Sequence, residues 1–197
     1  MQWATETEWR REQDDLERRA ERHERAIETA ARLEELGSPR LSIKVLFLDI
    51  DGVLVNRWSL MQASGCQAPF APACLTALNR ILRETTAQIV VTSVWRTEFS
   101  ELRRSSLQHL LTVKGVAGTV LDSTPVLRGQ ARVDEISQWL DEYERYPIKS
   151  FVILDDEGGM GSLSAHLVQT RHEIGLTEYD ADRAVNILGE NRPEGHI

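Results

Sequence analysis

Three short apolar runs constrain the fold of this chain more than any other feature of its sequence. They are SIKVLFLD at 42–49, AQIVVTS at 87–93 and SFVILDD at 150–156. Each is apolar at successive positions, which is typical of a strand buried on both faces. The alternation of these runs with helical patterns predicts an α/β fold, with a mostly parallel sheet between layers of helices. Those patterns occupy residues 73–84, 97–111, 133–144 and 176–189.

Two shorter segments extend the predicted sheet. GTVLDS at 118–123 and HLVQT at 166–170 are apolar enough for brief strands. Thr177 is the expected N-cap of the last helix, because a threonine hydroxyl can accept from a free backbone N–H of the first turn. The stretch 57–72 shows no regular period and is expected to be irregular.

The N-terminal segment has a different composition. Residues 5–36 are dense in Glu and Arg and contain neither Gly nor Pro. Apolar residues recur at spacings of seven and four, which predicts one long helix with a thin apolar stripe. We therefore expect a helical segment at 1–38 and a separate domain at 42–197. The stripe leaves open whether the helix packs on its own domain, projects into solvent or forms a homo-oligomer. Its members are Trp9, Leu16, Ala20, Ile27 and Ala31.

Composition excludes some classes of protein. No apolar run approaches the roughly 18 residues that a membrane-spanning helix needs. The N-terminus lacks the basic start and apolar stretch of a secretory signal, so a cytoplasmic protein is expected. The net charge of −8 argues against a broad basic face for coating nucleic acid, although it allows a small basic pocket.

Polar residues follow each of the three buried runs, where parallel strands bring their carboxyl ends to one edge of a sheet. Clustered carboxylates at such an edge repel one another, and a divalent cation relieves that repulsion. Mg²⁺ favours a few carboxylates together with phosphate oxygens, so the pattern predicts a metal–phosphate site. The residues are Asp49, Asp51 and Gly52 after the first run, Thr92 and Ser93 after the second, and Asp155 and Asp156 after the third.

The first of these groups suggests a division of tasks. Asp49 and Asp51 are two positions apart, so on a regular strand both would face the same way. One carboxylate can attack phosphorus while the other protonates the leaving oxygen and then activates water. Gly52 lets the backbone turn away without a side chain that would obstruct the phosphate.

These motifs resemble those of the haloacid dehalogenase (HAD) superfamily of phosphotransferases. DIDGVL at 49–54, QIVVT at 88–92 and FVILDD at 151–156 are similar to its first, second and fourth motifs. The third, a basic residue near a helix start, is matched by Arg132, with Arg128 as the alternative. The segments VTSVWR, VILDDE, LVQT and GLTEYDADRAVNIL resemble more narrowly the HAD domain of multi-enzyme, or Swiss Army Knife, RNA repair proteins.

The resemblance covers about residues 43–189 and implies a role for each matched position. Asp49 would be the nucleophile and Asp51 the general acid and base. Thr92, with Ser93 as the alternative, would hold the phosphoryl group, and Arg132 would steady it. The expected Mg²⁺ ligands are Asp49, Asp155, Asp156 and the backbone carbonyl of Asp51.

The spacing of the motifs bears on the substrate. The two intervals where HAD proteins carry a cap domain are too short here for one, so an open site and a large substrate are expected. The leading hypothesis is a Mg²⁺-dependent phosphomonoesterase that acts through an aspartyl-phosphate on nucleic-acid ends, at a 3′-phosphate. The alternatives are a phosphatase of nucleotides or small metabolites, and a non-catalytic interaction protein. The cations expected to bind the substrate are Arg57, Arg96, Arg128 and Arg132.

Several assignments stay open at the level of sequence. Arg96 can bind substrate phosphate or pair with an acidic side chain. Trp58 and Phe70 can stack on a base or be buried as loop anchors. Glu157 is expected to be exposed and His172 to be an ordinary loop histidine.

Overall fold

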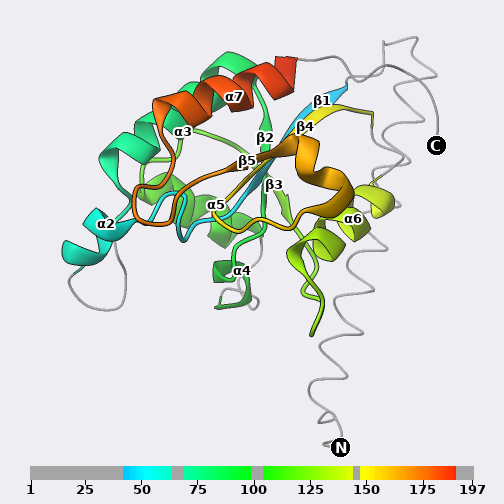
Figure 1. The fold of residues 1–197 in the computed structure, drawn as a ribbon, viewed down its shortest axis with the longest axis horizontal. Helices are drawn as coiled ribbons and strands as arrows, with labels where there is room; N and C mark the ends of the chain where they lie inside the picture. Colours follow the sequence, from blue (N-terminus) through cyan, green and yellow to red (C-terminus); the bar gives the residue numbers. More distant parts are fainter. Residues whose placement is uncertain (1–41, 64–68, 99–103, 144–146, 190–197) are drawn as a thin grey trace, which may run out of the picture. The chain divides into compact units, whose positions relative to one another are not determined.

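The computed structural model describes residues 42–63, 69–98, 104–143 and 147–189. They contain a five-stranded sheet in the order β3-β2-β1-β4-β5, and every neighbouring pair of strands is parallel (Figure 1). The α/β fold and all five expected strands are therefore confirmed. The strands are β1 (Ile43–Leu48), β2 (Gln88–Val91), β3 (Val120–Ser123), β4 (Ile148–Asp155) and β5 (Leu167–Gln169).

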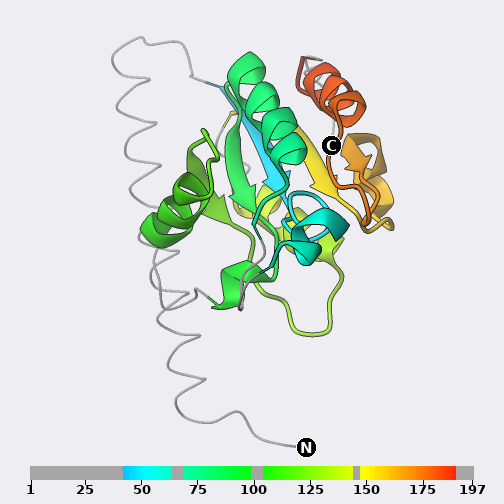
Figure 2. The ribbon, with the colours of Figure 1, turned by 90° about the vertical axis from the view of Figure 1, so that its left-hand side faces the viewer.

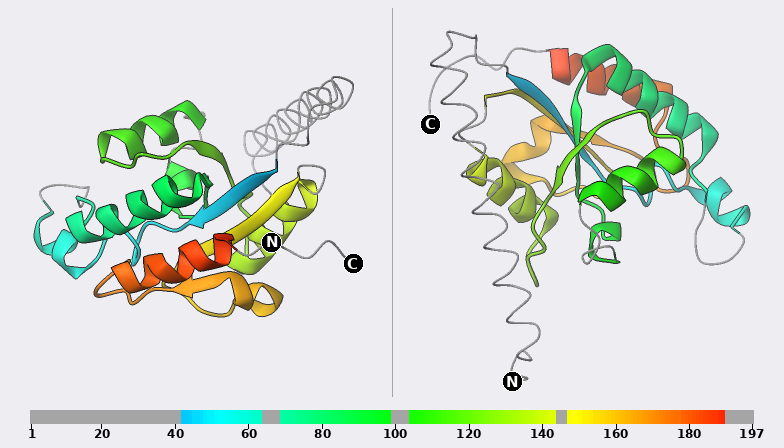
Figure 3. Two further views of the ribbon diagram at one scale, coloured as in Figure 1. Left: turned by 90° about the horizontal axis from the view of Figure 1, so that it is seen from above. Right: turned by 180° about the vertical axis from the view of Figure 1, so that it is seen from behind.

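The register of the sheet aligns the ends of its central strands. Leu48, the last residue of β1, pairs with Val91 of β2 on one side and with Leu154 of β4 on the other. Figure 3 shows β1 and β4 side by side at the middle of the sheet. The polar residues that follow β1, β2 and β4 therefore emerge at one level.

Helices cover both faces of this sheet. The helical elements are α2 (Arg57–Met61), α3 (Pro72–Thr85), α4 (Trp95–Glu98), α5 (Arg104–Val113), α6 (Arg132–Glu142), the 3₁₀ helix η1 (Gly161–His166) and α7 (Glu178–Gly189). Buried residues of α3, α5 and α7 pack on one face, where α3 also contacts α7 (Figures 1 and 2). On the other face, Ile136 and Trp139 of α6 pack against Phe47 of β1. This packing explains why the strand sequences are apolar at successive positions.

Local signals set the helix ends. Pro72 begins α3, where its missing N–H removes no helical hydrogen bond. The expected N-cap of α7 is confirmed: the Thr177 hydroxyl accepts from the Asp180 backbone N–H at 3.2 Å, and the Asp180 carboxylate accepts from the Thr177 N–H at 3.1 Å. At α6, the Asp134 carboxylate accepts from the Ala131 N–H at 3.0 Å and fixes the first turn.

One expectation about local structure was wrong. The stretch expected to be irregular contains α2, whose N-cap Asn56 accepts from the Ser59 N–H at 3.1 Å. The helix expected at 97–111 begins earlier, at Trp95, and its described parts are α4 and α5, while residues 99–103 lie outside the described residues. Ser93 explains the early start, because its hydroxyl accepts from the Trp95 N–H at 3.4 Å.

Between β1 and β2 the described residues form α2 and α3, and between β2 and β3 they form α4 and α5. Within these ranges no cap-sized domain is inserted. The helix expected at 1–38 lies outside the described residues, so its existence, packing and self-association stay predictions. No helix in the described part is long and apolar enough to cross a membrane.

Candidate active site

The loop after β1 places the first two acidic residues. The Asp49 N–H donates to Leu154 O of β4 at 3.0 Å, so Asp49 still belongs to the sheet ladder. The chain then turns around Ile50, a fully buried residue whose carbonyl accepts from the Leu54 and Val55 N–H groups at 2.8 and 2.9 Å. An apolar anchor between two carboxylates therefore fixes the loop, leaving Asp49 buried and Asp51 half-buried.

Gly52 makes room for a carboxylate of the next strand. Its φ is +73°, and a Cβ at this position would lie 2.2 Å from Asp156 Oδ2. The Thr170 hydroxyl donates to the Gly52 carbonyl at 2.7 Å and holds this close approach in place. The structure thus gives Gly52 a spatial reason that differs from the expected clearance for phosphate.

Asp49, Asp155 and Asp156 form a cluster suited to a cation. One carboxylate oxygen from each lies within 4.8 Å of the others. Asp155 is fully buried, and burial raises its pKa to about 7, with the neighbouring carboxylates adding to the rise and Arg132 opposing it. Buried carboxylates held this close need positive charge, and oxygen donors are what Mg²⁺ prefers. The donor set therefore fits a divalent metal, while the Asp51 carboxylate is not among the clustered groups.

Arg132 supplies a cation at the same point. It is the first residue of α6, and its Nη1 lies 3.1 Å from Asp49 Oδ1 and 3.0 Å from Asp155 Oδ2. Burial works to lower the pKa of Arg132, but the two carboxylates outweigh it and raise that pKa. Arg128 is exposed in the turn that precedes α6, so it does not share a helical face with Arg132.

The two hydroxyls after β2 have different surroundings. Both Thr92 and Ser93 are fully buried. The Thr92 hydroxyl accepts from Arg132 Nη1 at 3.4 Å, which brings it to the carboxylate cluster. The Ser93 hydroxyl instead accepts from the N–H of Trp95, so it is engaged at the start of α4.

Arg96 is a buried ion-pair partner. Its guanidinium lies 2.5 Å from Glu135 Oε2 of α6 and donates to the Thr124 and Pro125 carbonyls at 3.2 and 3.3 Å. Glu135 also accepts from the Leu127 N–H at 3.1 Å. Of the two alternatives for Arg96, the structure shows the acidic pair, which ties the loops after β2 and β3 to α6.

Trp95 contacts the site in a way that the sequence did not indicate. Its indole N–H donates to Asp51 Oδ2 at 2.9 Å. Burial raises the pKa of Asp51; the indole hydrogen bond opposes this rise, whereas Asp49 and Asp156 add to it. The Trp95 ring lies 6.1 Å from the Phe70 ring, measured between centroids, and the Lys114 ammonium lies over both rings, 5.6 Å from the Trp95 centroid and 5.1 Å from that of Phe70. Trp95 belongs to the VTSVWR segment that carries the family resemblance, but only the fold brings its side chain to Asp51.

The contact of His172 with the site was also not expected from the sequence. Its Nδ1 lies 2.7 Å from Asp156 Oδ2, and this contact raises the pKa of His172. It is therefore a neighbour of the carboxylate cluster rather than an ordinary loop residue. Glu157 is exposed, as expected, and its backbone N–H donates to Asp155 Oδ1 at 2.9 Å.

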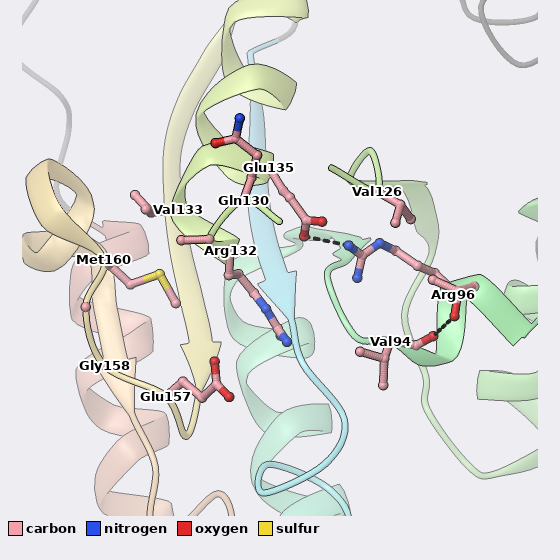
Figure 4. Close-up of a pocket in the computed structure, with 13 residues that line it drawn as sticks. Val94, Arg96, Val126, Gln130, Arg132, Val133, Glu135, Glu157, Gly158 and Met160 are labelled. Atoms are coloured by element: carbon pink, nitrogen blue, oxygen red, sulfur yellow. Dashed lines mark hydrogen bonds and ion pairs between the residues drawn. The ribbon is translucent and has the colours of Figure 1, made fainter. Parts of the chain in front are cut away.

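A hollow of about 340 Å³ opens beside Arg132. In Figure 4 the Arg132 side chain extends between Val94 and Val126 on one side and Met160 on the other, with Glu157 near its tip. The hollow leaves Arg132 accessible to a ligand. The guanidinium of Arg96, which also lines the hollow, is already paired with Glu135, as the dashed line in Figure 4 marks.

Comparison with known proteins identifies the family. Residues 45–181 match the model of the family described as "HAD domain in Swiss Army Knife RNA repair proteins". The match covers most of the chain, which therefore belongs to this family. None of the curated proteins compared matches the chain.

Proposed function

We propose that this HAD-domain protein is a Mg²⁺-dependent phosphomonoesterase that removes a 3′-phosphate from nucleic-acid ends through an aspartyl-phosphate. The observation that carries the proposal is the convergence of Arg132, Thr92 and the clustered carboxylates on Asp49. A buried carboxylate beside a guanidinium and a hydroxyl can accept a phosphoryl group whose charge those donors balance.

The first half of the reaction forms a bond to Asp49. One Asp49 oxygen attacks phosphorus, the bond from phosphorus to the ester oxygen breaks, and Asp51 gives its proton to that leaving oxygen. Arg132 and the Thr92 hydroxyl stabilise the charge on the phosphoryl oxygens. The raised pKa of Asp51, which burial causes, favours the protonated form that this step needs.

The second half restores the enzyme. Asp51, now a carboxylate, removes a proton from water, and the water oxygen attacks phosphorus. The bond from phosphorus to Asp49 breaks, and inorganic phosphate leaves. A divalent cation held by Asp49, Asp155, Asp156 and the Asp51 carbonyl would neutralise charge on the phosphoryl group.

Two observations support a nucleic-acid end as the substrate. The family is that of a HAD domain in RNA repair proteins. No cap-sized insertion encloses the site in the described part of the chain, which leaves space for a polymer to extend away from it.

The test is phosphate release from a 3′-phosphorylated oligonucleotide, a 5′-phosphorylated oligonucleotide and a set of mononucleotides, each with Mg²⁺ and with EDTA. The proposal expects rapid, metal-dependent release from the 3′-phosphorylated oligonucleotide and none with Asp49→Asn. Preference for mononucleotides would indicate a small-molecule phosphatase instead. Equal release by wild type and Asp49→Asn would refute the aspartyl-phosphate route.

A further inference from the structure

We propose that helix α2 binds the terminal nucleotide of a single-stranded substrate, with its base stacked on Trp58 and the next backbone phosphate against Arg57. This inference rests on the proposed function and extends it, because it names the surface that distinguishes a polynucleotide end from other phosphomonoesters.

The position of α2 follows from the catalytic loop. Asp51 forms a β-bridge with Val55, and the Gly52 N–H donates to Val55 O at 2.8 Å. Asn56 then caps α2, so Arg57 and Trp58 begin the helix directly after this loop. Asp51 must face the leaving oxygen in order to protonate it. The rest of the substrate therefore leaves the site on the side of Asp51, where α2 begins.

Hydrogen bonds hold α2 against a second loop of the site. The Asn56 side-chain amide donates to Ile174 O at 2.6 Å, and the Arg57 N–H donates to Glu173 O at 3.3 Å. The same loop carries His172, which contacts Asp156. A helix fixed to both loops offers a preorganised surface, which reduces the entropy lost when a ligand binds.

The outer surface of α2 is unusually apolar. Trp58 is 45% exposed, Leu60 58% and Met61 76%, although the helix has only five residues. Trp58 and Met61 are three positions apart and so share a side of the helix, and exposed apolar side chains that gather on one side mark binding surfaces more often than isolated ones do. An exposed indole face stacks on any base and so suits a substrate of variable sequence. Phe70, the other aromatic candidate, is 6% exposed and packs in the core.

Charge favours a nucleotide over an apolar protein segment as the occupant. Arg57 is exposed, and its side chain has no hydrogen bond or ion pair with any residue that the structure describes. Arg96 and Arg132, by contrast, are engaged by Glu135 and by Asp49. Arg57 is therefore available for a second phosphate, which an oligonucleotide has and a nucleoside 3′-monophosphate lacks.

The experiment compares kcat/KM for a 3′-phosphorylated trinucleotide, a nucleoside 3′-monophosphate and p-nitrophenyl phosphate. Relative to p-nitrophenyl phosphate, Trp58→Ala should lower kcat/KM about 5- to 100-fold for both nucleotides, because a stacked base is lost. Trp58→Phe keeps an aromatic face and should therefore retain most of the wild-type kcat/KM for both nucleotides. Arg57→Ala should lower only the trinucleotide value. Arg83→Ala is the control, because Arg83 is exposed in the last turn of α3, which leads to the opposite edge of the sheet.

A binding measurement keeps the inference separate from the proposed activity. Fluorescence anisotropy of a labelled 3′-phosphorylated oligonucleotide with Asp49→Asn gives Kd without turnover. Adding Arg57→Ala should make the dependence of log Kd on log salt shallower by about 0.7, the value for one single-strand phosphate contact. Trp58→Ala should weaken binding by the same factor as it lowers kcat/KM.

Three results would overturn the inference. One is a loss of kcat/KM in the α2 variants that is equal for p-nitrophenyl phosphate and the trinucleotide, which would give α2 a purely structural role. Another is unchanged oligonucleotide affinity in both variants. The third comes from the same kinetic comparison with a phosphoserine peptide as a fourth substrate: a loss of kcat/KM confined to that peptide would make a protein the occupant of α2. A wild type that releases no phosphate but binds the oligonucleotide through Trp58 would refute the proposed function alone.

Discussion

Replacing Gly52 with alanine tests how the loop after β1 and the carboxylate cluster depend on each other. The residue has a φ of +73°, and the new Cβ would lie 2.2 Å from Asp156 Oδ2 and 2.3 Å from Asp156 Cγ. Either the loop or the Asp156 side chain must move by about 1 Å to regain ordinary contact. Asp156 is the more movable of the two, because Thr170 holds the Gly52 carbonyl and Asp156 lies near the surface.

Gly129 provides a matched control. Its φ is +75°, and a Cβ there would meet nothing within 4 Å. Gly129→Ala therefore carries only the penalty of a left-handed alanine, about 1–2 kcal/mol. Gly52→Ala carries the same penalty plus about 1–3 kcal/mol for overpacking. Since 1 kcal/mol shifts Tm by roughly 2–4 °C in a domain of this size, both variants are expected to fold.

Thermal unfolding with and without Mg²⁺ separates the two effects. Mg²⁺ at about 100 times its Kd should stabilise wild type by about 2.7 kcal/mol, and Gly129→Ala should keep this increment. Gly52→Ala should lose most of it, because the displaced Asp156 oxygen no longer meets those of Asp49 and Asp155. A full Mg²⁺ increment in Gly52→Ala would refute the reasoning that Gly52 is needed for the position of Asp156.

Three further predictions concern single contacts. Trp95→Phe removes the hydrogen bond that orients the Asp51 carboxyl, and although its loss raises the pKa of Asp51 further, the lost orientation should slow kcat about tenfold for an alkyl phosphate, whose leaving group needs a proton. The effect should be smaller for p-nitrophenyl phosphate, and the ratio of the two kcat values checks this. Glu135→Ala leaves the Arg96 guanidinium buried without its carboxylate, so chemical denaturation should show a free energy of unfolding lower by about 3–5 kcal/mol. Burial raises the pKa of Asp155 to about 7, above its ordinary 3.8. Its protonated form then favours the fold, so in EDTA stability should fall as pH rises from about 4 to 7, and urea denaturation of Asp155→Asn should lack this slope.

The sheet could be predicted from the sequence because strands that are buried on both faces need apolar residues at successive positions. The runs that became β1, β2 and β4 are apolar at successive positions, and their short length and β-branched residues favour buried strands over buried helices. Helix α2 could not be predicted, since five residues are too few to show a helical period. It forms because the Asn56 side chain joins it both to Ser59 and to the distant Ile174.

The candidate site divides in the same way. The carboxylates and Thr92 could be located because each follows a strand, and parallel strands meet at one edge. The contacts of Trp95 with Asp51 and of Arg96 with Glu135 could not, because they join residues 44 and 39 positions apart through the geometry of loops. The composition of the loops is compatible with many such pairs, and only the packed sheet selects among them.

The charges of the site set a condition for the proposed binding of phosphate by an acidic protein. Among the described residues, Arg132 is the guanidinium in contact with this cluster, through Asp49 and Asp155, and Asp156 contacts His172, so the fully ionised cluster repels a phosphoryl dianion. In the proposed function a divalent cation would balance the remaining charge, and phosphate affinity would then depend on metal binding rather than on the net charge of the chain. Two features of the structure leave the carboxylate charge to be balanced by a metal. Arg96 is already committed to Glu135, and Gly52 holds Asp156 close to the cluster. Any further guanidinium for a substrate therefore has to come from outside the carboxylate cluster, and Arg57 on α2 occupies such a position beside the loop after β1.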